Sequence, residues 1–160
     1  MWTDALFPRV NVAVEVADAQ TGALLDHLET HNLVVLAGRN LARDLLYWKS
    51  TGDDPRPLGL NWFGVGTSTV AATAADVALG VEMFRDQFTS RSKSDGQCIY
   101  QYYLGSGSAN GNTLGEVGLF GSSATSSSGS GVLYARAVHT GVAKTASVAI
   151  TYTWTLSWEV

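Results

Sequence analysis

The clearest pattern in the chain is an alternation of large apolar and hydroxyl side chains around residue 154. Ile150, Tyr152, Trp154 and Leu156 are separated by single threonines. A period of two places these four side chains on one face, which predicts a strand of an antiparallel sheet packed against a core. The strand contains no Lys, Pro or charged residue before position 159, although exposed edge strands usually carry such protection. We therefore expect it to be central in its sheet or to pair with a neighbouring subunit.

The same alternation predicts further strands. Valines at positions 10, 12, 14 and 16 repeat the pattern, and residues 18–22 then form a turn that ends on glycine. A second strand from residue 23 to 28 or beyond would complete a hairpin. The remaining strands are expected at residues 98–104, 115–120, 131–139 and 147–158.

Residues 62–80 look like a phosphate-binding loop but lack the features that such a loop requires. Gly64 and Gly66 are followed by three hydroxyl residues, and no basic residue occurs before Arg85. A phosphate-binding loop carries a Lys or a third Gly at a fixed offset and opens a long helix. We therefore interpret the segment as scaffold, with a strand and a tight turn at the two glycines.

A short helix is expected after this turn, at about residues 74–79. Thr73 is placed as its N-cap, and Asp76, three residues later, completes a capping box. Gly80 is placed as its C-terminal stop.

A longer helix is predicted at about residues 37–48. Leu41, Leu45 and Trp48 fall on one stripe, and the prolines at 55 and 57 prevent the helix from continuing. The expected fold class is therefore mainly β: an antiparallel β-sandwich or barrel-like domain over residues 10–160, with these two helices.

Two segments of low complexity separate predicted strands. Residues 105–112 and 121–131 are rich in Gly, Ser and Asn, which favour turns and flexibility. We interpret both as mobile loops at one end of the sheet. They could either be solvated or contact a receptor such as a host glycan.

The composition points to assembly. Hydrophobic residues make up 46% of the 160 residues, which is compatible with a core, but charged residues make up only 15%. Ordinary domains carry about 25% charged residues, so part of this surface is expected to be covered by partner chains. Residues 1–9 are interpreted as an extended arm that docks on a neighbour through Trp2, Leu6 and Phe7.

Several partners are excluded by charge and patterning. A formal net charge of −4 with three lysines does not provide the basic stripe that nucleic-acid binding requires. The longest apolar run, residues 33–37, is far too short to cross a bilayer. A single cysteine and the lack of a secretory leader pattern lead us to expect folding in a reducing cytoplasm.

No metal or reactive thiol is expected. His27, Glu29 and His31 would share one face of a strand, but no third His or Cys ligand lies near them in the sequence. Their alternative role is a solvent-facing or subunit-contacting surface. Cys98 opens a predicted strand and is typical of a small buried thiol.

No catalytic pair is expected either. Residues Asp53 and Asp54 flank prolines in a loop, where carboxylates keep ordinary acidity. The carboxylates Glu82 and Asp86 stand near Arg85 and indicate a surface ion cluster. We therefore expect a non-enzymatic protein without catalytic residues or a cofactor.

An alternative function is a carbohydrate-binding or receptor-binding module. Its stacking platform would be formed by aromatic residues on one strand face. The strict alternation indicates that the first of the two sets is core. The two candidate sets are Tyr152, Trp154 and Trp158, and Tyr100, Tyr102 and Tyr103.

Five groups of short segments, in order, carry a resemblance that covers nearly the whole chain. They are the turn at 21–22 that leads into 31–34 and 37–40; 63–67 with the short helix, Glu82 and Arg85; 116–120; 133–138; and 151–156. Together they resemble a family of tailed-bacteriophage virion proteins found in tail, baseplate and fibre-attachment contexts. Relatives often carry Gly where Ser68 stands and Pro near Ala71 or Ala72, which this chain lacks.

The resemblance implies a structural protein that acts by oligomeric assembly. It would be a small tail, baseplate or fibre-adaptor component or a capsid-decorating protein, located in the virion and assembled in the host cytoplasm. Fibre proteins often continue such a module into a shaft, and we expect this chain to be the module alone. Its partners would be other copies of itself, with a trimer favoured, and other virion proteins. The residues expected to matter are therefore structural, including Gly118 for close backbone approach.

Overall fold

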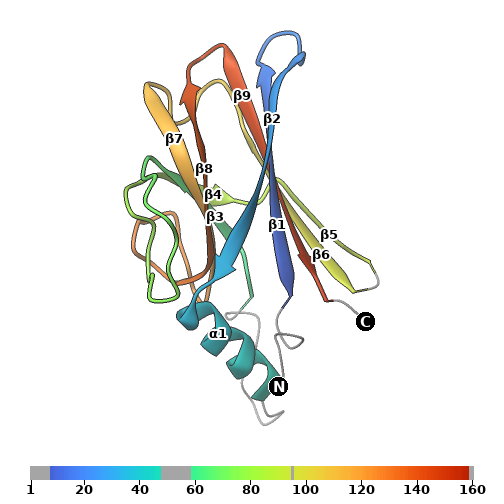
Figure 1. Ribbon diagram of the computed structural model, residues 1–160, viewed down its shortest axis with the longest axis vertical. Coiled ribbons are helices and arrows are strands. Elements are labelled where there is room, and N and C mark those ends of the chain that lie inside the picture. Colours follow the sequence, from blue (N-terminus) through green and yellow to red (C-terminus); the bar gives the residue numbers. More distant parts are fainter. Residues whose placement is uncertain (1–7, 48–58, 95, 159–160) are drawn as a thin grey trace.

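One antiparallel sheet organises the protein, as the computed structural model shows for residues 8–47, 59–94 and 96–158 (Figure 1). The elements are β1 (Arg9–Asp18), β2 (Leu24–Val34), α1 (Leu36–Tyr47), β3 (Trp62–Gly66), β4 (Glu82–Gln87), β5 (Ser90–Ser94), β6 (Gln97–Leu104), β7 (Asn112–Gly121), β8 (Val132–Lys144) and β9 (Val148–Ser157). Within the described residues, the strand order is β4-β3-β7-β8-β2-β1-β9-β6-β5. The predicted fold class, a mainly β, barrel-like domain, is confirmed.

Strand β2 curls the sheet because it pairs with two different neighbours. Residues 24–31 pair with β1, whereas residues 32–34 pair with β8. The sheet therefore forms two layers, β4-β3-β7-β8 and β1-β9-β6-β5, on either side of the main core (Figure 1). Across this core, the rings of Phe63 in β3 and Tyr102 in β6 stack with their centroids 4.6 Å apart.

Strand β9 lies in the middle of its layer, paired with β1 on one side and β6 on the other. Of the two predicted alternatives, a central strand or pairing with a neighbouring subunit, the structure shows the first, which explains why the strand needs no edge protection. Of the described strands, β4 and β5 form the edges of the sheet. The four alternating apolar side chains of β9 are at most 2% exposed: Ile150, Tyr152, Trp154 and Leu156.

The hairpin between β1 and β2 also forms as predicted. The Asp18 Oδ1 atom accepts hydrogen bonds from the backbone N–H groups of Thr21 (2.7 Å) and Gln20 (3.1 Å). Gly22 has a φ of 72°, a conformation that glycine adopts without strain.

Helix α1 begins and ends one residue earlier than the predicted range 37–48. Leu41 is buried, while the Leu45 side chain and Trp48 lie outside the described part of the structure. Gly38 lies so close to β8 that a Cβ would collide with the backbone carbonyl of Tyr134. None of the described helical residues forms a segment long and apolar enough to traverse a bilayer.

The predicted turn at Gly64 and Gly66 is wrong, because both glycines lie inside strand β3. Gly64 pairs with Gly118 of β7. A Cβ on either residue would lie 2.9–3.3 Å from side-chain atoms of Leu79 and Phe120. Gly64 and Gly118 therefore make room for side chains that pack over the sheet, rather than for the close backbone approach predicted at Gly118, whereas Gly66 makes room for the backbone carbonyl of Val81.

The predicted short helix at about 74–79 is also wrong, because the segment forms a turn followed by irregular chain. Thr73 does donate its backbone N–H to the Asp76 carboxylate at 3.0 Å, as in a capping box, but its hydroxyl donates to the same carboxylate at 2.6 Å instead of accepting from the Asp76 N–H. The same carboxylate, however, accepts a hydrogen bond from Arg136 in β8. This tertiary partner holds the segment against the sheet.

Strands β4 and β5 have no counterpart among the predicted strands. The best-buried residue of β4 is Arg85, and β5 reads Ser-Arg-Ser-Lys-Ser without an apolar residue. Apolar alternation therefore reveals neither strand.

The two low-complexity loops do not share one end of the sheet. Residues 105–111 precede β7 and residues 122–131 follow it. Because a single strand separates them, the loops lie at opposite ends.

Replacing Gly38 by Ala should lower the free energy of unfolding by about 2 kcal/mol or more, because the new Cβ forces helix α1 away from β8. Chemical denaturation monitored by circular dichroism would measure the loss. Gly107→Ala is the matched control, since a Cβ there meets no atom within 4 Å. Equal stability of the two variants would contradict the close helix contact.

Candidate functional site

A buried ion network lies on the outer face of the layer β4-β3-β7-β8, the face turned away from the main core. Its centre is Glu116 in β7, which is fully buried. The carboxylate accepts hydrogen bonds from the backbone N–H groups of Val81 (2.7 Å), Gly80 (2.9 Å) and Ser68 (3.3 Å). It also accepts one from Arg136 Nε at 2.8 Å. A buried charge is tolerated only when it is paired and hydrogen-bonded in this way.

Arg136 in β8 connects this carboxylate to a second one. Its Nη1 donates to Asp76 Oδ2 at 2.8 Å, and its Nη2 donates to the carbonyl oxygen of Val70 at 3.0 Å. Burial alone would lower the pKa of Arg136, but the carboxylates of Asp76 and Glu116 outweigh it and raise the pKa. Through these contacts Arg136 fastens residues 67–81 to the sheet.

The same contacts shift the pKa of the Asp76 carboxyl group. Partial burial would raise its pKa, but the hydrogen bonds from Thr73 and the contact with Arg136 outweigh burial and lower the pKa below 3.8. The ionised form is thus the one that the folded protein stabilises.

A second buried ion pair corrects the prediction of a surface cluster at residues 82–86. Arg85 donates two hydrogen bonds of 2.7 Å to Glu82, and the two side chains are 2% and 7% exposed. The Arg85 guanidinium lies 3.7 Å from the centroid of the Phe120 ring and donates to the Ser130 carbonyl oxygen at 2.7 Å. This pair fastens residues 122–131 to the sheet.

Asp86 is the only member of the predicted cluster that is exposed. It accepts a hydrogen bond of 3.2 Å from the hydroxyl of Tyr102. Burial, followed by the charge of Asp86, raises the pKa of Tyr102. Glu82 and Arg85 therefore pair with each other, while Asp86 contacts a different residue, Tyr102.

Residues 67–81 cover the buried charges of the network, and several of their apolar side chains face the solvent. Val70, Val77 and Val81 are 72%, 75% and 51% exposed, and Met83 in the edge strand β4 is 44% exposed. We call these four residues the loop patch. The backbone of Val81 bonds to Glu116, the backbone of Val70 bonds to Arg136, and Val77 follows Asp76, which also bonds to Arg136. The network therefore determines where the patch lies.

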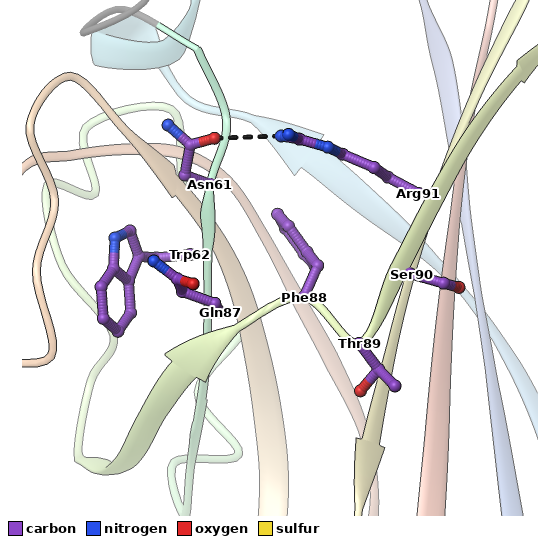
Figure 2. Close-up of a pocket in the computed structure, with 7 residues that line it drawn as sticks. All are labelled: Asn61, Trp62, Gln87, Phe88, Thr89, Ser90 and Arg91. Carbon is purple, nitrogen blue, oxygen red and sulfur yellow. Dashed lines mark hydrogen bonds between the residues drawn. The ribbon is translucent and has the colours of Figure 1, made fainter.

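The second notable feature is a pocket of about 460 Å³ beside the connection between β4 and β5 (Figure 2). Arg91 Nη1 donates a hydrogen bond of 3.1 Å to Asn61 Oδ1 across it. The Phe88 ring projects between these segments and contacts Tyr100 with a centroid distance of 4.9 Å. The pocket is lined by Asn61, Trp62, Gln87, Phe88, Thr89, Ser90 and Arg91.

The histidines of β2 do not converge on a metal site. His27 Nε2 lies 3.5 Å from Glu29 Oε1, and His31 Nδ1 lies 3.0 Å from Asn11 Oδ1. All three predicted residues are exposed, and the described residues contain no group of three or more His, Cys, Asp or Glu that could hold a metal ion. This face of β2 is a polar surface.

The two aromatic sets considered for sugar stacking are not platforms. Tyr152 and Trp154 are fully buried and Tyr102 is 5% exposed, so their ring faces are unavailable to a ligand. Tyr103 and Trp158 are exposed, at 50% and 41%.

Other candidates are structural or lie outside the described residues. Cys98 is half-buried against the main core. Lys144, which the sequence analysis did not single out, is buried and donates to Asn110 Oδ1 (2.8 Å), which anchors the loop 105–111. The arm residues Trp2, Leu6 and Phe7, and the carboxylates at 53 and 54, are outside the described ranges, and the arm stays a prediction.

Comparison of the chain with protein-family models, with curated proteins and with solved structures gives no match.

Replacing Glu116 by Gln should lower the free energy of unfolding by about 3 kcal/mol or more, because the buried Arg136 then keeps only Asp76 as a charged partner and the amide offers one acceptor oxygen instead of two. Hydrogen exchange should also show loss of protection at the backbone N–H groups of Gly80 and Val81. Glu15→Gln, at an exposed position of β1, is the control and should change neither measurement. Equal stability of both variants would contradict the anchoring role of Glu116.

Acid should weaken the attachment of residues 67–81. Because the pKa of Asp76 is lowered on folding, the ionised carboxylate stabilises the folded state above pH 3.8, and this stabilisation is lost as the pH falls below that value. The wild-type protein should therefore lose more stability than Asp76→Asn when unfolding is measured between about pH 5 and about pH 3. Asp26→Asn, at an exposed residue, should follow the wild-type curve. Parallel curves for wild type and Asp76→Asn would refute the linkage.

Proposed function

We propose that the protein is a non-enzymatic structural subunit of a tailed-phage virion and that it works by binding other copies of itself, with a trimer favoured. The observation that carries this proposal is the loop patch. Its valines are exposed on a segment held by buried ion pairs, with Val77 75% exposed. The charges of Glu116 and Arg136 do not contribute to this surface, because residues 67–81 cover them.

Self-association would remove this apolar surface from water. Burying a valine side chain stabilises an interface by about 1.5 kcal/mol, so the loop patch could contribute several kcal/mol. Closed symmetric assemblies present the same surface patch from each subunit. The low charged fraction of the chain, 15%, is consistent with such coverage.

The place in the particle follows from the resemblance of the five segment groups. It supports a small tail, baseplate or fibre-adaptor component or a capsid-decorating protein, which binds other virion proteins after synthesis in the host cytoplasm. The loops 105–112 and 121–131 are candidates for contact with a host glycan. Both are anchored to the sheet, through Lys144 and Arg85 respectively.

Replacing both Val70 and Val77 by Asp should convert an oligomer into a monomer at micromolar concentration, as measured by light scattering. Each lost valine contact should weaken association about tenfold, and the introduced charges should weaken it further. Leu25→Asp is the matched control, because Leu25 is 59% exposed and lies in the hairpin away from the ion network. The oligomer mass of this variant should equal that of the wild type. A monomeric wild type, or an oligomeric double variant, would contradict the proposal.

A further inference from the structure

The pocket beside the β4–β5 connection combines groups that suit a specific class of ligand. The chain passes from one layer of the sheet to the other between Gln87 and Ser90, and the start of β3 lies opposite (Figure 2). The pocket is therefore built by residues about thirty positions apart in the sequence. Its volume of about 460 Å³ is within the range of small-molecule sites, roughly 300–1,000 Å³.

Arg91 supplies an available positive charge. It is exposed, and its hydrogen bond goes to the neutral amide oxygen of Asn61. Among the described residues, no carboxylate forms an ion pair with Arg91. A guanidinium binds a planar carboxylate with two parallel hydrogen bonds, so an acidic group is the natural partner of this side chain.

The remaining lining suits a sugar ring. Phe88 is a half-buried aromatic residue of the pocket, and an aromatic face attracts the weakly positive C–H groups of a sugar. The Asn61 amide donates to the carbonyl oxygen of Gly59 at 3.2 Å and accepts from Arg91, which leaves one N–H and one lone pair of the amide for a sugar hydroxyl. The side chains of Trp62 and Gln87 point away from Phe88 and Arg91 in Figure 2, and Trp62 packs against the smaller buried cluster that contains Leu79 and Phe120.

The two hydroxyl residues shape the pocket instead of offering free groups. Thr89 Oγ1 accepts a hydrogen bond from the backbone N–H of Tyr103 at 2.9 Å, and Ser90 Oγ donates to Gln101 Oε1 at 3.0 Å. Both side chains point away from Phe88 in Figure 2. These contacts fix the backbone from which Phe88 and Arg91 project.

We propose that this pocket binds a carboxylated sugar of a uronic acid type. Arg91 binds the carboxylate, Phe88 packs against the C–H face of the ring, and the remaining N–H and lone pair of the Asn61 amide bind a hydroxyl. An acidic peptide would satisfy Arg91 but would not use the aromatic face. The pocket and the loop patch share no residue, so binding here does not require self-association.

The test is titration of the full chain with tri-galacturonic acid, monitored by calorimetry and by the NMR shift of the Arg91 Nε–H group. Saturable binding is expected with a Kd of about 1 mM or below. Arg91→Gln should weaken it about tenfold or more, which is the effect of losing a charged hydrogen bond. Lys93→Gln removes the same charge two residues along the exposed strand β5 and should change the Kd by less than about twofold.

The methyl ester of the same trisaccharide separates charge from shape. It should bind at least about tenfold more weakly than the acid, because the carboxylate partner of Arg91 is gone. Equal binding of acid and ester, equal effects of the two variants, or absence of saturable binding would each overturn the proposal. Binding of tri-glutamate or of inorganic phosphate as tight as that of the sugar would overturn it as well, because the pocket would then be a general anion site.

Discussion

The hydrogen-bonded pair of Glu116 and Arg136 is the constraint on which the outer half of the structure depends. Both charges lie on a sheet face that would otherwise be open to water, and both are buried. Such a pair is stable only when its other hydrogen-bonding positions are also satisfied. Residues 67–81 provide those partners through three backbone N–H groups, a carbonyl and Asp76. The loop and the ion pair therefore depend on each other.

This arrangement places charged side chains of the sheet beneath a loop and leaves apolar side chains of the loop exposed. Glu116 and Arg136 are covered by residues 67–81, while three valines of that segment are exposed. Lone exposed apolar residues are common, but several on one segment are the basis of the proposed contact surface. The burial of these charges contributes to a surface poor in charge. Packing of the loop and the proposed self-association are thus two consequences of one buried pair.

The short connection between β4 and β5 has a comparable influence on another part of the molecule. It carries the chain between the two layers, so edge strands of both layers lie close to the start of β3 (Figure 1). Phe88 and Arg91 project from this connection toward Asn61 and form the pocket. The main core, which joins Phe63 to Tyr102, holds the layers at the separation that this connection spans.

The sequence by itself determined the strands with an apolar face, the β1–β2 hairpin and helix α1, because periodicity and turn residues are local signals. Strands β4 and β5 could not be predicted from the sequence, because the buried part of β4 is chiefly an ion pair and β5 has no apolar residue. Tertiary structure alone decided that residues 74–79 form no helix, because Asp76 binds Arg136, sixty residues away. It also decided where the loop patch and the pocket lie, since both depend on contacts between segments that are distant in the chain, and no local pattern encodes such contacts.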